Sequence, residues 1–199
     1  MNYLGHLYLS GKDEEIITGN FIADHVKGKM FDKYSEGIRE GILLHREIDI
    51  YTDSHPAFLQ SKNRLADTYR KYAGVIIDMY YDHFLSRYWD DYHAEDIDRF
   101  TNRMYAIVLK RIDLLPARAK RLHTYMARDN WLKGYGSFEG LGRALSGMAR
   151  RTPFESGMEK AVDDLKRNYP RFYEEFSEFF SDIIRFCKEK GFGPGTLSF

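Results

Sequence analysis

Helical spacing of apolar residues is the feature that most constrains how this chain can fold. In the segment SEGIREGILLHREIDIYTD, apolar residues recur every three or four positions from Ile38 to Tyr51, which is the repeat of one helix face. The same spacing appears in YAGVIIDMYYDHFLSRYW, in IDRFTNRMYAIVLKRI and in the late segment YPRFYEEFSEFFSDIIRFCKEK. These segments do not alternate as strands would. The pattern predicts an all-α fold.

The positions of the prolines and the absence of a linker favour one domain. The five prolines fall where a helix could begin or end, as expected for a residue tolerated at first helical turns. The sequence shows no internal repeat, low-complexity tract or Pro/Gly-rich linker, and its 199 residues suit one sizeable core. We therefore expect a single-domain helical bundle over residues 1–199.

Charge and composition exclude several classes of protein. Thirty basic side chains balance thirty acidic ones, which argues against a general nucleic-acid binder. No apolar run approaches the length of a membrane span, and the first residues lack the pattern of a signal peptide. A single cysteine, Cys187, precludes an internal disulfide framework. We expect a cytoplasmic protein that binds neither nucleic acid nor membrane.

Polar side chains interrupt two of the apolar helical segments. His45 and Asp49 lie four residues apart and share one helix face, flanked by isoleucines and leucines. In DMYYDHF, Asp78 and Asp82 share a face and His83 follows one position further round. Two stacked carboxylates in an apolar setting repel each other unless a cation or a proton lies between them. Histidine nitrogen and aspartate oxygen are common ligands of divalent metals.

The first twenty-five residues repeat this combination. His6 lies among leucines, and Asn20 and Asp24 lie four residues apart in ITGNFIADHVKG. Each polar residue has an ordinary explanation, because a single buried histidine is usually hydrogen-bonded in the core and His45 with Asp49 could be a plain ion pair. The coincidence of three such segments is what favours a metal site. Its spacing is much less specific than that of a HExxH motif.

Other chemistries are not indicated. The stretch GLGRALSG, from Gly140 to Gly147, contains glycines but does not follow a strand, so it does not predict a nucleotide-binding loop. A local excess of basic residues extends from Lys110 to Arg128, and Arg150 and Arg151 add a further pair. Such a run is either a solvated helix face or a docking surface for an acidic partner.

Five motifs taken together resemble the acyl carrier protein phosphodiesterase family. In chain order they are MNYLGHLYLS, GNFIADHVKG, GILLHREIDIYTDSHP, DMYYDHFLSRYW and LSGMARR. The resemblance spans nearly the whole chain. It implies an all-helical fold like that of the HD-domain phosphohydrolases, with a rearranged motif order. It also implies removal of the 4′-phosphopantetheine arm from holo-acyl carrier protein, supported by a divalent cation, typically manganese.

The resemblance places Asp24, His45, Asp82 and His83 on the family's signature polar positions, with His6, Asp49 and Asp78 around them. On this basis we expect the following roles. Four are expected to hold the metal: His6, Asp24, His45 and Asp82. Three are expected to take part in catalysis: His83 as the acid that protonates the leaving serine, and Asp49 and Asp78 as orienting groups or ligands of a second ion. The expected substrate-binding residues are Asn20, Lys27 and Arg46, with Arg118, Lys120 and Arg121 facing the acidic carrier protein.

Two other functions are compatible with the same residues. A metal-dependent phosphohydrolase of a small phosphoester, such as a nucleotide, would share the metal site but would have no use for a basic docking face. A non-catalytic helical interaction protein would use the same histidines and aspartates as buried ion pairs. It would bind no metal.

Overall fold

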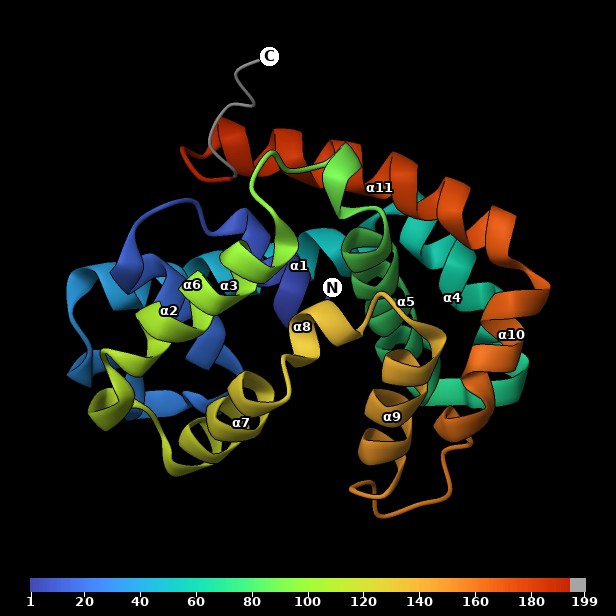
Figure 1. The fold of residues 1–199 in the computed structure, drawn as a ribbon, viewed down its shortest axis with the longest axis horizontal. Coiled ribbons are helices and arrows are strands. Elements are labelled where there is room, and N and C mark those ends of the chain that lie inside the picture. Colours follow the sequence, from blue (N-terminus) through green and yellow to red (C-terminus); the bar gives the residue numbers. More distant parts are fainter. Residues whose placement is uncertain (194–199) are drawn as a thin grey trace.

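The computed structural model describes residues 1–193, and α-helices dominate them (Figure 1). The α-helices are α1 (Tyr3–Leu9), α2 (Glu14–Ile22), α3 (Glu36–Ser54), α4 (Pro56–Tyr69), α5 (Ala73–Arg87), α6 (Ile97–Leu109), α7 (Ala117–Arg128), α8 (Trp131–Gly134), α9 (Phe138–Ala149), α10 (Ala161–Arg167) and α11 (Tyr169–Glu189). Short 3-10 helices join them: η1 (Ala23–His25), η2 (Gly28–Lys33), η3 (Arg70–Tyr72), η4 (Trp89–Asp91), η5 (Ile112–Leu114) and η6 (Met158–Lys160). No residue from 1 to 193 lies in a strand, which confirms the predicted all-α fold.

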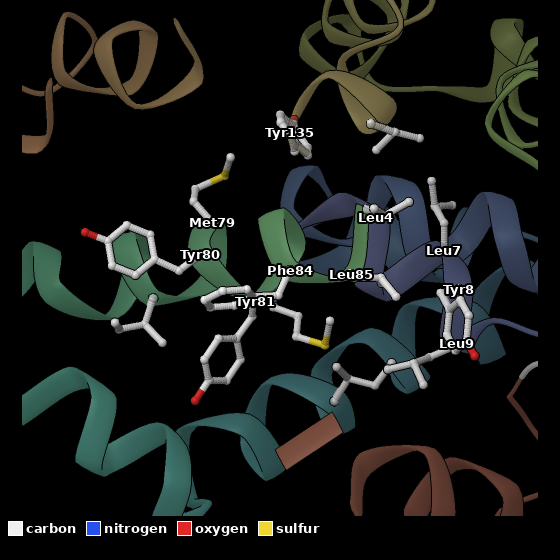
Figure 2. Close-up of a cluster of buried hydrophobic side chains, with 14 of the residues drawn as sticks. Leu4, Leu7, Tyr8, Leu9, Met79, Tyr80, Tyr81, Phe84, Leu85 and Tyr135 are labelled. Carbon is white, nitrogen blue, oxygen red and sulfur yellow. The ribbon is translucent and has the colours of Figure 1, made fainter. Parts of the chain in front are cut away.

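Helix α5 forms the centre of the core. Almost every side chain from Ile76 to Ser86 is buried, and Figure 2 shows Tyr80, Tyr81 and Phe84 along this helix, with Leu4, Leu7 and Leu9 of α1 to the right of them. Helix α11 closes this core along one long side (Figure 1) with four fully buried phenylalanines: Phe172, Phe176, Phe179 and Phe180. Burying such large rings is the main source of stability for a helix of this kind. None of the helices in residues 1–193 is both long and apolar enough to cross a bilayer.

Helices α2 and α3 cross at two glycines. A Cβ atom on Gly19 would lie 2.0 Å from the carbonyl oxygen of Ile38, and one on Gly41 would lie 2.2 Å from that of Ile16. Any side chain at either position would therefore force the two backbones apart. This close crossing brings Asn20 of α2 against His45 of α3, which is where the candidate site begins.

Candidate functional site

Asn20 holds two histidines in one orientation. Its amide nitrogen donates to the carbonyl oxygen of His6 (3.1 Å) and to Ser10 Oγ (2.8 Å). Because a carbonyl oxygen can only accept, the amide oxygen of Asn20 must face the other way, where it lies 3.0 Å from His6 Nδ1 and 2.9 Å from His45 Nδ1. Both Nδ1 atoms are therefore the protonated donors. An imidazole held by Nδ1 in this way presents Nε2 to a metal ion.

The two Nε2 atoms face carboxylates. His6 Nε2 lies 3.2 Å from Asp49 Oδ1, and His45 Nε2 lies 3.3 Å from Asp49 Oδ2. Asp24 Oδ1 lies 3.4 Å from His45 Nε2. The imidazole rings stack with centroids 4.0 Å apart. The predicted sharing of one helix face by His45 and Asp49 is confirmed.

Electrostatics leave an excess of negative charge in this cluster. Burial and the nearby charge of His45 lower the pKa of His6 to about 4. Burial also acts to lower the pKa of His45, but its contacts with Asp24 and Asp49 outweigh burial and raise that pKa to about 9. The hydrogen bond to His45 lowers the pKa of Asp24, and the two histidines lower that of Asp49 despite its burial. At neutral pH one imidazolium therefore faces two carboxylates.

This donor set fits a divalent metal ion. One ligand atom from each of His6, His45 and Asp49 lies within 4.8 Å of the others. Two ligands that each lie about 2 Å from one ion are themselves about 3 Å apart, so little movement would be needed. Two imidazole nitrogens with carboxylate oxygens form a mixed set that suits first-row divalent metals. Asp24 lies beside His45 as a further oxygen ligand.

A pocket of about 460 Å³ opens over the cluster. Its wall includes His6, Asp24, His45 and Asp49, together with Met1, Asn2, Tyr3, Thr52, Asp53, Lys62, Lys71, Gly74, Val75 and Asp78. The predicted residue Asp78 thus lines the same pocket, where it accepts a hydrogen bond from the amino group of Met1 (2.7 Å). Burial raises the pKa of Asp78, against the opposing effect of that amino group.

Two lysines line this pocket that we did not predict from the sequence. Lys62 on α4 and Lys71 in η3 line it, and neither makes an ion pair with any residue in the range 1–193. Unpaired cations beside a metal site are suited to phosphate oxygens. In the sequence, each lysine resembles any other charge on an exposed helix, and only the fold brings them to the histidines. The predicted cations Lys27 and Arg46 are exposed and do not line the pocket; Arg46 lies over the ring of Phe31.

Asn20 lies behind the histidines instead of on the pocket wall. Its side chain is fully buried, so its contacts are with His6, His45 and Ser10. We predicted that it binds substrate, whereas its position suits a residue that orients the two ligands.

Asp82 lies outside the group formed by His6, His45 and Asp49. Its carboxylate is fully buried and accepts hydrogen bonds from the backbone N–H groups of Asn2, Leu4 and Gly5 at 3.2, 2.8 and 3.1 Å. These are unpaired donors at the start of α1, which a carboxylate stabilises. Burial raises the pKa of Asp82 to about 7, against these donors and the Met1 amino group. The geometry makes Asp82 the anchor of the helix that carries His6.

Replacing Asp82 with alanine is expected to lower the free energy of unfolding by about 3 kcal/mol, because three buried N–H groups lose their acceptor. Urea unfolding in excess chelator measures this loss. The matched control is Asp96→Ala, which removes an exposed N-cap from α6 and should cost about 1 kcal/mol. If Asp82 were instead a metal ligand, its replacement would destabilise only the metal-loaded protein.

His83 is also outside the cluster. Its Nδ1 lies 2.8 Å from the carbonyl oxygen of Tyr135 and its Nε2 lies 3.2 Å from the hydroxyl of Tyr169. The ring is buried, and burial lowers its pKa to about 4. The structure thus does not bring His83 to the pocket in which we predicted it would act as an acid.

The predicted docking residues differ in whether they form ion pairs with acidic residues. Lys120 lies 3.4 Å from Asp113. Arg118 and Arg121 are exposed, and neither pairs with an acidic residue of the described chain. Arg150 is likewise exposed and unpaired within residues 1–193. A positive surface beside α7 and the end of α9 therefore remains available to an acidic partner.

Comparison with known proteins decides the family. The family model described as acyl carrier protein phosphodiesterase matches residues 1–183. The chain belongs to the acyl carrier protein phosphodiesterase family. The cluster of His6, His45 and Asp49 lies entirely within the part that this family model matches.

Relatives extend over nearly the whole chain. Proteins named acyl carrier protein phosphodiesterase from Serratia proteamaculans and Yersinia enterocolitica are each 30% identical over 191 residues, which is 96% of this chain and 99% of theirs. One from Photorhabdus laumondii is 30% identical over 193 residues, covering 96% of this chain and 98% of its own. No solved structure matches the chain, so the relation to the HD-domain fold stays a prediction.

Proposed function

We propose that this member of the acyl carrier protein phosphodiesterase family hydrolyses the phosphodiester that joins 4′-phosphopantetheine to its carrier protein, with a divalent metal, manganese, as cofactor. The observation that carries the proposal is the pair of histidines that Asn20 orients towards Asp49. The family match and the names of the relatives supply the substrate. A carrier-protein substrate also implies an enzyme of the cytoplasm.

His6, His45 and Asp49 would hold the metal, with Asp24 as a further ligand. When bound, a divalent ion lowers the pKa of a water molecule and polarises a phosphoryl oxygen. Lys62 and Lys71 would balance the remaining charge of the phosphate from the wall of the same pocket. Asn20 keeps the Nδ1 proton on both imidazoles, so that each Nε2 stays available as a ligand.

The atoms of the reaction balance as a hydrolysis. The oxygen of water forms a new bond to phosphorus, and the bond between phosphorus and the serine oxygen of the carrier protein breaks. The serine oxygen takes up a proton, because an alkoxide is a poor leaving group. The products are the apo carrier protein and free 4′-phosphopantetheine.

Intact mass spectrometry of holo-acyl carrier protein tests the proposal. The carrier protein is incubated with this protein and manganese, and a parallel sample contains excess chelator. We expect loss of the arm only in the sample with metal. No loss, together with hydrolysis of bis(4-nitrophenyl) phosphate, would favour a small phosphoester as substrate. No metal binding and no hydrolysis would mean that the histidine cluster has only a structural role.

A further inference from the structure

A second, larger cavity lies beside the same site. It has a volume of about 1140 Å³ and shares three wall residues, Asn2, Tyr3 and Asp24, with the pocket over the histidines. The rest of its wall comes mainly from α7, α8 and α9, and Figure 1 shows α7 and α9 on either side of α8. Such a volume exceeds that of most small-molecule pockets. The cavity, called the groove below, therefore adjoins the pocket over the histidines.

The wall of this groove is apolar with a basic margin. Leu122 of α7 and Ala144 and Met148 of α9 supply apolar surface. Arg150 and Arg151, which follow α9, supply positive charge. Arg151 donates through Nε to the carbonyl oxygen of Gly147 (3.0 Å), whereas Arg150 makes no ion pair with another described residue. The apolar part of the wall thus suits an uncharged chain, and the basic margin suits an acidic group elsewhere on the same ligand.

Helix α9 leaves room for such a ligand because it carries no large side chain at two positions. Leu141 and Leu145 of this helix are fully buried in the core. Gly142 and Gly147 line the groove instead. A Cβ atom on Gly147 would meet nothing within 4 Å, and one on Gly142 would meet only Val162, at 3.6 Å. The absence of side chains here costs helix stability, and the gain is open volume.

We propose that this groove binds the pantetheine arm of the holo carrier protein while its phosphodiester lies over His6, His45 and Asp49. The inference rests on the proposed function. The arm is a thin, uncharged chain with a geminal dimethyl group, a hydroxyl and two amides, and it is attached to the reacting phosphate. A ligand of that form could pass from one cavity to the other beside Tyr3 and Asp24, which line both. Contacts along the arm would then supply binding energy remote from the reacting bond.

Filling the groove from Gly147 tests the assignment. Gly147→Leu places a side chain in open space and replaces glycine in a helix with a better helix former, so the variant should fold and bind manganese as the wild type does. Melting temperature and metal content establish this. We expect kcat/KM for holo-acyl carrier protein to fall at least about tenfold, because the leucine side chain would fill the space that we assign to the arm. Hydrolysis of bis(4-nitrophenyl) phosphate, which has no arm, should stay within about twofold of wild type.

A graded series and a binding measurement complete the test. Gly147→Ala should have a smaller effect than Gly147→Leu, since the cavity tolerates one methyl group. In excess chelator, the wild type should bind the holo carrier protein more tightly than the apo form, and Gly147→Leu should lose that preference.

The outcomes separate the two levels of inference. If the wild type removes the arm and Gly147→Leu does so equally well, the groove assignment is overturned and the proposed function stands. If the wild type leaves the holo carrier protein intact, the proposed function fails and the arm assignment fails with it. Equal loss of both reactions in Gly147→Leu would locate its effect at the metal pocket and would also overturn the groove assignment.

Discussion

Replacing His45 with alanine is expected to lower hydrolysis of holo-acyl carrier protein at least about a thousandfold, because the metal site loses a ligand worth several kcal/mol to the transition state. His45 is the residue shared by most contacts of the cluster, since its ring touches Asn20, Asp24 and Asp49. The rate is measured by intact mass spectrometry with saturating manganese, and bound metal is counted separately on the same sample.

The matched control is His93→Gln. His93 is a half-buried histidine whose Nδ1 accepts from the backbone of Glu95, and it lines neither cavity. This variant should keep both metal and activity. A His45→Ala protein that still bound manganese and released the arm at the wild-type rate would refute the metal centre described above.

The candidate site could be predicted in part because helical periodicity reveals which polar residues are buried. His6, His45 and Asp49 stood out as polar residues in apolar helices, and the fold brings them together. The same signal also selected Asp82 and His83, which the fold places elsewhere. A buried carboxylate can be satisfied either by a metal or by backbone N–H groups. Sequence alone does not show that α1 begins against Asp82.

Features that depend on packing between distant segments had no sequence signal. Lys62 and Lys71 belong to α4 and η3, and only the fold brings them to the pocket over His6. The glycines of GLGRALSG were noted only because they do not form a nucleotide loop, yet Gly142 and Gly147 line the larger cavity. A glycine indicates open volume only when the element that faces it is known, and here that element is α7.

Replacing Gly41 with alanine is expected to lower the free energy of unfolding by about 3 kcal/mol, which corresponds to a fall in melting temperature of about 10 °C for a chain of this size. The new methyl group would lie 2.2 Å from the carbonyl oxygen of Ile16 and 2.9 Å from the backbone nitrogen of Asn20. Neither backbone atom can move without shifting α2. Helix propensity acts in the opposite direction, but alanine gains only about 1 kcal/mol over glycine.

The shift would also reach the metal centre, because Asn20 must keep its amide oxygen near both imidazoles. Manganese affinity is therefore expected to fall about tenfold to a hundredfold, as for loss of an orienting partner. Gly142→Ala is the matched control: it sits inside α9 with ordinary contact to Val162, so it should gain up to about 1 kcal/mol and leave metal affinity unchanged. Urea unfolding and manganese titration of both variants give the comparison. Wild-type stability and affinity in Gly41→Ala would mean that α2 and α3 do not need this close crossing to build the site.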